Sequence, residues 1–348
     1  MKKSLKSIPS PRLLGPDVIR IIAIYLVIHL HTFGIVNDSG MLSAFFQKFD
    51  ILSVPLFVML SGALLLDKQE GYDKFFWKRC LKVLLPWIAW TIFYMIYNFN
   101  SHHSQIMAEF SGPNIPLFYS WIHFFLRVFL SSFWFLPMIF SLYLITPLLR
   151  IFVKNATTFD NLYFIALWFI IASVLPFLFN NPLFPVWTPN IILSPIYYSG
   201  YFLLGYVVIK QKIFKINNLF ILILIALFPF LISLLPFNSR VIHESATGFL
   251  YPGTVIASVF FFNFLLTASK RLEKYVNQPV RKIITIISGA SFGVFLIHGI
   301  FIDIFEKRII DFLRIFHTEF SLTLTIFCLL TIIIIVLQQI PVLKKLVP

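Results

Sequence analysis

The sequence predicts an all-α fold: a polytopic transmembrane helical bundle of about ten spans with both termini in the cytoplasm. The first observation is composition, because 59% of the 348 residues are hydrophobic and only 12% are charged. A soluble globular chain carries about 25% charged residues. The second is that apolar residues recur in runs of about 20, the length that a helix needs to cross a bilayer. The third is the position of the basic residues between these runs.

Continuous hydrophobicity over such lengths fits helices, since the strands of membrane barrels are shorter and alternate in polarity. The predicted spans are residues 17–36, 45–66, 80–99, 132–153, 161–180, 189–209, 216–236, 249–267, 284–306 and 319–340.

The basic residues support this count of spans. With the N-terminus in the cytoplasm, 21 of the 28 Lys and Arg residues fall in inner segments, 6 fall in outer segments, and Arg20 lies inside the first span. Cytoplasmic loops of membrane proteins carry such an excess. One span more or fewer would invert every later loop and weaken the asymmetry. The same rule explains the net charge of +14 without a nucleic-acid partner.

We expect one integral membrane domain over residues 1–348, with a short cytoplasmic tail at 1–16. The longest outer connection is 100–131, and its second half, IPLFYSWIHFFLRVFLSS, is amphipathic. This pattern predicts an interfacial or re-entrant helix on the outer face. A further span is the alternative, which the charge asymmetry disfavours.

The first span carries polar residues that a membrane helix normally lacks. In DVIRIIAIYLVIHLH they are Asp17, Arg20, His29 and His31, and Asp or Arg costs about 2.5–3.5 kcal/mol at the bilayer centre. At about 100° per residue, Arg20 and His31 share one face, about 16 Å apart along the axis. His29 points the opposite way, and we interpret it as structural. The stripe must face protein or a water-filled cavity. The alternative is that Asp17 and Arg20 only anchor the helix at the inner interface.

The first span resembles the first helix of the acyltransferase-3 family of integral membrane O-acyltransferases, whose pattern is Arg, ten residues, then His. Four later segments, in order, are also similar to that family. They are SVPLFVMLSGALLL (53–66), FWKRCLKVLLPW (76–87), SSFWFLPMIFSLYLITPLL (131–149) and SFGVFLIHGIFI (291–302). Length and two of these segments look most like the stand-alone subgroup that includes the enterobacterial common antigen O-acetyltransferase. Two positions depart from the pattern: Lys82 replaces a frequent Arg, and Phe295 replaces the usual Tyr.

The resemblance implies transfer of an acyl group, usually acetyl from acetyl-CoA, to a hydroxyl of a surface carbohydrate. It implies that Arg20 and His31 are catalytic, with His31 as the general base or the transient acyl acceptor. An imidazole has the near-neutral pKa that either role needs. The residues do not separate the two roles.

The donor of this family is a cytoplasmic polyanion, so the resemblance implies a basic binding site on the inner side. We assign Arg79, Lys82 and Ser61 to donor binding. Ordinary positive-inside charge is the alternative for the two cations, and close helix packing is the alternative for the serine. We expect acyl-CoA as a co-substrate, no permanently bound cofactor and no metal site.

Four further residues are assigned to substrate binding or support: Asp17, Trp134, Tyr143 and His298. Asp17 would orient Arg20, and the two aromatic residues would shape the acceptor side. An aromatic interface belt explains Trp134 equally well, and His298 is either a support of the site or a core histidine.

The sequence therefore predicts a multi-pass acyltransferase of the bacterial cytoplasmic membrane that modifies a cell-envelope polysaccharide. Its expected partners are acyl-CoA, a glycan or lipid-linked sugar, and membrane lipids, with no nucleic acid. A carrier or exporter of glycans or lipid-linked intermediates is the alternative, since a polar stripe also suits transport. A non-catalytic scaffold would leave the insertion cost of the stripe without a benefit. The acyl group, the acceptor sugar and the oligomeric state are left open.

Overall fold

The computed structural model describes residues 13–35, 41–110, 117–179, 194–213, 216–233, 248–313 and 318–348. Within these ranges the chain forms helices joined by turns, and no residue belongs to a strand. The predicted all-α class is confirmed.

The first half of the chain contains α1 (Leu14–Thr32), α2 (Met41–Phe49), α3 (Ser53–Leu65), α4 (Tyr72–Arg79), α5 (Leu85–Phe110), α6 (Leu117–Arg127) and α7 (Phe135–Asn155). The second half contains α8 (Thr158–Phe169), α9 (Leu175–Phe179), α10 (Ser194–Tyr206), α11 (Leu219–Ser233), α13 (Pro252–Leu272), α14 (Gln278–Leu313) and α15 (Glu319–Leu337). Tight or wide helical turns interrupt or extend these helices, namely η1 (Asp50–Leu52), η2 (Cys80–Leu84), η3 (Val128–Ser132), η4 (Ile170–Val174), η5 (Val207–Gln211) and η6 (Leu343–Lys345).

Eight helical segments in the described ranges have the length and hydrophobicity of membrane spans. They coincide with eight of the ten predicted spans. The other two, 189–209 and 216–236, correspond to α10 with η5 and to α11, and each extends into residues outside the described ranges, as does the tail at 1–16. The total number of spans, the cytoplasmic position of both termini and the single-domain interpretation stay predictions.

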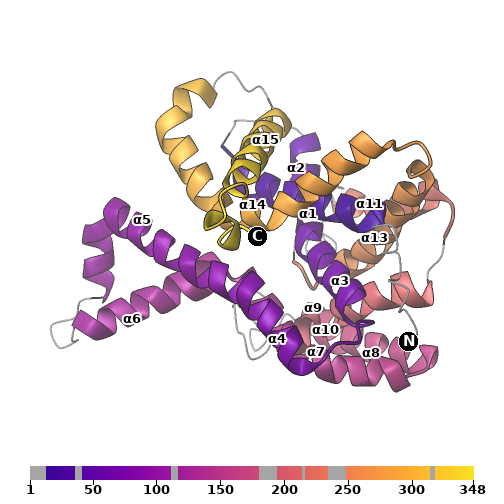
Figure 1. Ribbon diagram of the computed structural model, residues 1–348. Helices are drawn as coiled ribbons and strands as arrows, with labels where there is room; N and C mark the ends of the chain where they lie inside the picture. Colours follow the sequence, from indigo (N-terminus) through magenta and orange to yellow (C-terminus); the bar gives the residue numbers. More distant parts are fainter. Residues whose placement is uncertain are drawn as a thin grey trace, which may run out of the picture.

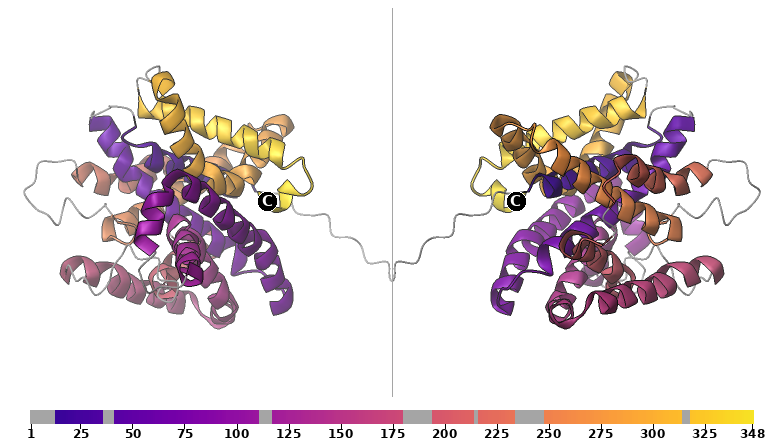
Figure 2. Two further views of the ribbon diagram at one scale, coloured as in Figure 1. Left: turned by 90° about the vertical axis from the view of Figure 1, so that its left-hand side faces the viewer. Right: turned by 90° about the vertical axis from the view of Figure 1, so that its right-hand side faces the viewer.

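Helix α1 lies in the interior of the bundle. It packs against α3, α13, α14 and α15, and these helices surround it in Figure 1. Figure 2 shows the same bundle from two sides, with α15 along one edge and α8 along the opposite edge. Within the polar stripe of α1, Asp17 is buried, Arg20 is partly buried and His31 is exposed, so the helices around α1 cover one end of the stripe more than the other.

Helices α3 and α10 approach each other through two glycines. A Cβ built on Gly62 would lie 1.7 Å from the carbonyl oxygen of Phe202, and one built on Gly205 would lie 1.7 Å from that of Met59. Each glycine therefore admits the backbone of the other helix, as is typical of small residues in membrane helix packing. This contact fixes the position of α3, which carries Ser61.

The third predicted span is longer in the structure than the 80–99 that hydrophobicity indicated. The helix begins at Tyr72, passes through the π turn η2 and continues to Phe110, because no Gly or Pro follows Pro86 until Gly112. A helix is present at 117–127 within the predicted outer segment. This helix, α6, packs beside α5, and the pair projects from the bundle (Figure 1).

One aromatic contact anchors this projecting pair. The ring of Trp87 stacks on that of Phe129 with centroids 3.7 Å apart, and its indole N–H donates to the Phe129 carbonyl oxygen at 3.1 Å. The indole of Trp87 thus has a stacked ring against its face and a hydrogen-bond acceptor for its N–H. The placement of α6 at a membrane interface stays a prediction.

Candidate active site

Arg20 is held at one end of α1 by a carboxylate and a hydroxyl. Its Nη1 donates to Asp17 Oδ1 at 3.1 Å and lies 3.3 Å from Ser288 Oγ. The Ser288 hydroxyl donates to the same Asp17 oxygen at 2.8 Å. Asp17 is only 2% exposed, so little water competes for these bonds. The geometry fits the orienting role predicted for Asp17.

Sequence reasoning missed Ser288. Its only signal is its place in a run of small residues, Ser288 to Ser291, on α14, a helix that packs against α1. Serines in such runs are common in membrane helices, so the run alone does not distinguish a site residue from a packing residue.

His31 lies at the other end of α1 and faces His298 of α14. The two imidazole centroids are 4.9 Å apart. The His31 side chain is exposed, whereas His298 is buried. Nδ1 of His298 lies 2.5 Å from the carbonyl oxygen of Phe295, and a carbonyl only accepts, so Nδ1 carries the proton. The structure thus brings together two predicted site residues that are far apart in the sequence.

His29 points away from this pair, as the helical phase predicted. Its Nδ1 lies 2.5 Å from Asp50 Oδ2, and both side chains are buried. The ring also packs edge-on against Phe46, with centroids 6.2 Å apart. These contacts join α1 to η1, which fits a structural role.

A cavity of about 330 Å³ lies between α1, α3, η2, α7 and α14. Five predicted site residues line it: Arg20, Ser61, Arg79, Lys82 and Tyr143. Three of them are cations, and no Asp or Glu side chain is among the described residues that line the cavity. Its volume is in the range of small-molecule sites, and its charge suits an anionic ligand.

Arg79 reaches this cavity between two aromatic rings. Its guanidinium carbon lies 5.3 Å from the centroid of Phe75 and 5.4 Å from that of Tyr143. Its buried Nε has no hydrogen-bond partner among the described residues. Cation–π contacts on two sides hold the planar group in place, which leaves N–H donors for a ligand. Lys82 follows in the π turn η2, a feature that is frequent at functional sites.

A chain of aromatic contacts leads from the cavity to the histidine pair. Phe135 and Phe295 line the cavity, with centroids 5.4 Å apart. The Phe295 ring is also 5.5 Å from the ring of His298. His31 does not line the cavity itself. Phe295, which replaces the usual Tyr of the resembled family, therefore both lines the basic cavity and contacts His298, the neighbour of His31.

Trp134 is a predicted site residue that the structure does not place in the cavity, although its ring lies 6.4 Å from that of Phe135, which lines it. It is half-buried and packs against Phe249, with centroids 5.2 Å apart, and it does not line the cavity. Within the described ranges, no group of three or more His, Cys, Asp or Glu side chains is arranged to hold a metal ion.

The candidate site consists of the polar stripe on α1, the basic cavity and the histidine pair. Comparison with known proteins identifies the family of the chain. The family model described as an acyltransferase domain, of the acyltransferase-3 family, matches residues 13–338. The chain belongs to the acyltransferase-3 family. It is therefore an acyltransferase, and its apolar helices make it a membrane acyltransferase. The comparisons with curated proteins and with solved structures found no match.

The match to the acyltransferase-3 family includes all the predicted site residues, whereas Pro348, which also lines the cavity, lies beyond it. The cations of the cavity and the histidine pair thus lie within the acyltransferase domain. The resemblance to the subgroup of the enterobacterial common antigen enzyme stays a prediction.

Proposed function

We propose that this membrane acyltransferase moves an acyl group, in the first place acetyl, from cytoplasmic acyl-CoA to a hydroxyl of a cell-envelope carbohydrate or lipid-linked sugar. The proposed location is the cytoplasmic membrane of a bacterium. One observation carries the proposal: a cavity lined by three cations is also lined by Phe295, whose ring contacts that of His298 in the histidine pair.

The cations suit the donor because acyl-CoA carries its negative charges on phosphates, far from its thioester. Arg79 and Arg20 are both preorganised, one by aromatic rings and one by Asp17. Guanidinium groups bind phosphate oxygens through two parallel N–H donors. Since Arg20 lies about 16 Å from His31 along α1, it would bind the donor rather than act on the carbonyl carbon.

His31 would carry the chemistry at the far end of the path. As a general base, it takes the proton of the sugar hydroxyl while the oxygen attacks the thioester carbonyl. The C–S bond breaks, and the thiolate of CoA leaves and takes up a proton. As a nucleophile, the imidazole forms an acyl-histidine, CoA leaves, and the sugar hydroxyl then accepts the acyl group. The exposed position of His31 gives an acceptor access to it.

Membership in an acyltransferase family does not favour the carrier or exporter that the polar stripe also suggested. The carrier interpretation would need no thioester chemistry, so the experiment that follows separates the two.

The test uses the purified protein in nanodiscs with radiolabelled acetyl-CoA. We expect the wild type to release CoA or retain label, and His31→Ala to do neither. His123→Ala is the matched control, because His123 is an exposed histidine on α6. Equal activity in the wild type, His31→Ala and His123→Ala would refute the role of His31. If neither acetyl-CoA nor succinyl-CoA is bound or consumed by the wild type, the donor assignment is wrong. Transient label on the wild type would favour acyl-histidine.

A further inference from the structure

A second hollow, of about 270 Å³, lies beside the segment that joins α3 to α4. It is lined by charged residues of this segment and of the end of α7, among them Asp67, Lys68, Glu70, Arg150 and Lys154. None of these residues belongs to the basic cavity described above. The hollow is therefore a separate site with its own set of ionic groups.

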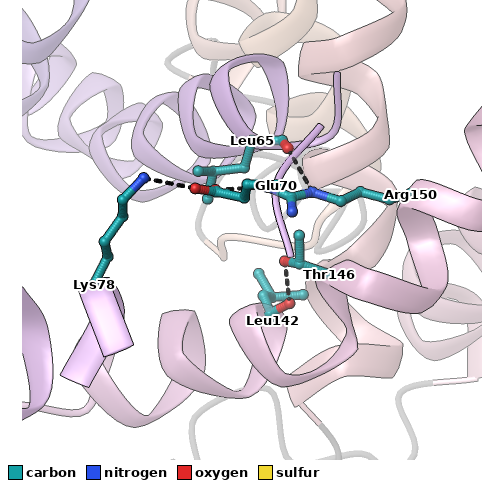
Figure 3. A network of polar contacts seen from close by, with 6 residues as sticks. All are labelled: Leu65, Glu70, Lys78, Leu142, Thr146 and Arg150. Atoms are coloured by element: carbon teal, nitrogen blue, oxygen red, sulfur yellow. Dashed lines mark hydrogen bonds and ion pairs between the residues drawn. The ribbon is translucent and has the colours of Figure 1, made fainter. Parts of the chain in front are cut away.

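Glu70 is held in this hollow by two cations from different helices. Its Oε2 accepts from Lys78 Nζ at 2.7 Å, and its Oε1 accepts from Arg150 Nη2 at 3.2 Å. Figure 3 shows Lys78 of α4 and Arg150 of α7 approaching the carboxylate from opposite sides. Two cations that bind the two oxygens of one carboxylate could bind two oxygens of a phosphate group in the same way.

Arg150 is positioned independently of Glu70. Its Nε donates to the Leu65 carbonyl oxygen at 3.0 Å, and its guanidinium carbon lies 4.5 Å from the Phe75 ring centroid. Its Nη1 is buried without a hydrogen-bond partner among the described residues. A buried donor without an acceptor is costly, so this N–H is available for an oxygen of a ligand that enters the hollow.

The surroundings carry more positive than negative charge. The pKa of Lys68 is lowered, first by desolvation and then by the charges of Arg79, Lys78 and Arg150, while Glu70 opposes this effect. Two carboxylates, Asp67 and Glu70, thus stand among the four basic side chains Lys68, Lys78, Arg79 and Arg150, and Asp67 also pairs with Lys210 at 2.6 Å. Such a concentration of one charge attracts polyanions.

The hollow adjoins the basic cavity. The ring of Phe75 contacts the guanidinium of Arg79, which lines the cavity, and that of Arg150, which lines the hollow. An extended anion with several phosphates could therefore contact both sites at once, with one aromatic ring between them.

We propose that Lys78 and Arg150 form a subsite for a phosphate at the nucleotide end of acyl-CoA, and that Glu70 occupies this subsite until the donor displaces it. The proposal rests on the proposed function, because it takes acyl-CoA as the donor. In the absence of a ligand, Glu70 would keep the two cations in place. It would weaken the apparent affinity for acyl-CoA because it competes for the same N–H groups.

The experiment measures the dissociation constant of CoA by calorimetry with the full chain in nanodiscs. We expect Lys78→Gln and Arg150→Gln to raise the dissociation constant about tenfold, the effect of one lost charge-assisted contact. Glu70→Gln should lower it by about threefold or more, since the competing charge is gone. Glu273→Gln is the matched control, because Glu273 pairs with Arg281 at 2.6 Å outside this hollow. It should bind CoA as the wild type does.

Each outcome has a definite meaning. If Glu70→Gln binds CoA no more tightly than the control, Glu70 does not compete and the proposal is wrong. If the wild type binds CoA and Lys78→Gln binds it equally well, only the subsite is refuted and the proposed function stands. If the wild type does not bind CoA, the proposed function and the subsite fail together. Lys78 and Glu70 decide the test even if Arg150→Gln misfolds after losing its bond to Leu65.

Discussion

Gly62→Ala is expected to destabilise the bundle strongly through a single methyl group. The added Cβ would lie 1.7 Å from the Phe202 carbonyl oxygen, and real Cβ contacts essentially never fall below 3.0 Å. The helices α3 and α10 must therefore separate by about 1.3 Å, and no rotamer relieves a clash with backbone. Overpacking in a tight interior costs about 1–3 kcal/mol, and the upper end applies here.

The assay for Gly62→Ala is reversible unfolding in mixed micelles of increasing SDS content, followed by ellipticity. Gly289→Ala is the control, because Gly289 is also helical but a Cβ there meets nothing within 4 Å. Helix propensity alone favours Ala over Gly by about 1 kcal/mol, so the control should be as stable as the wild type or more stable. If Gly62→Ala unfolds at the same SDS fraction as Gly289→Ala, the close contact of α3 and α10 is refuted.

Three further substitutions test other contacts. His29→Ala leaves the buried carboxylate of Asp50 without its partner, and it should lower stability by about 1–3 kcal/mol in the same SDS assay, whereas exposed His31→Ala should not. Phe295→Ala removes the ring that lines the cavity and contacts His298, so the ratio of butyryl to acetyl transfer should rise in a competition assay, and an unchanged ratio would contradict this. The pKa of Glu70 is lowered, mainly by its bond to Lys78. The stability that Glu70 contributes is therefore complete above the ordinary pKa of 4.5 and is lost as pH falls through the lowered value. Melting curves of Glu70→Gln should lack this acid-side decline.

The sequence predicted those features that follow from local pattern. Composition and apolar runs specify membrane helices because each helix must satisfy its own backbone in lipid. Helical phase separated His31 from His29, and the structure places them against different partners, His298 and Asp50. These predictions depend on residues close together in the chain, where helix geometry alone determines which side chains share a face.

The sequence did not reveal contacts between distant segments. Glu70 and Arg150 are 80 residues apart, and Arg150 appeared only as one of many positive-inside charges. The continuation of α5 to Phe110 was missed because hydrophobicity marks where lipid contact ends, whereas a helix ends at a breaker such as Gly112. Polarity and helicity are separate properties, and only the first was used to place that boundary.

The arrangement along α1 connects the chemistry of the donor with the physics of the bilayer. The cations of the cavity and the hollow are Arg20 and basic residues of neighbouring segments. His31 lies about 16 Å farther along α1 than Arg20 does. Phosphates cannot follow the acyl group to that depth without a large desolvation cost. The uncharged pantetheine arm of acyl-CoA can extend to that depth without this cost. Under the proposed function, a fold that held phosphates at one end of α1 and presented a histidine at the other would let a charged donor deliver its acyl group within the membrane, with the charged end remaining behind. Under the same proposal, Phe295, which lines the cavity and contacts His298, would be a position at which the size of the acyl group is selected.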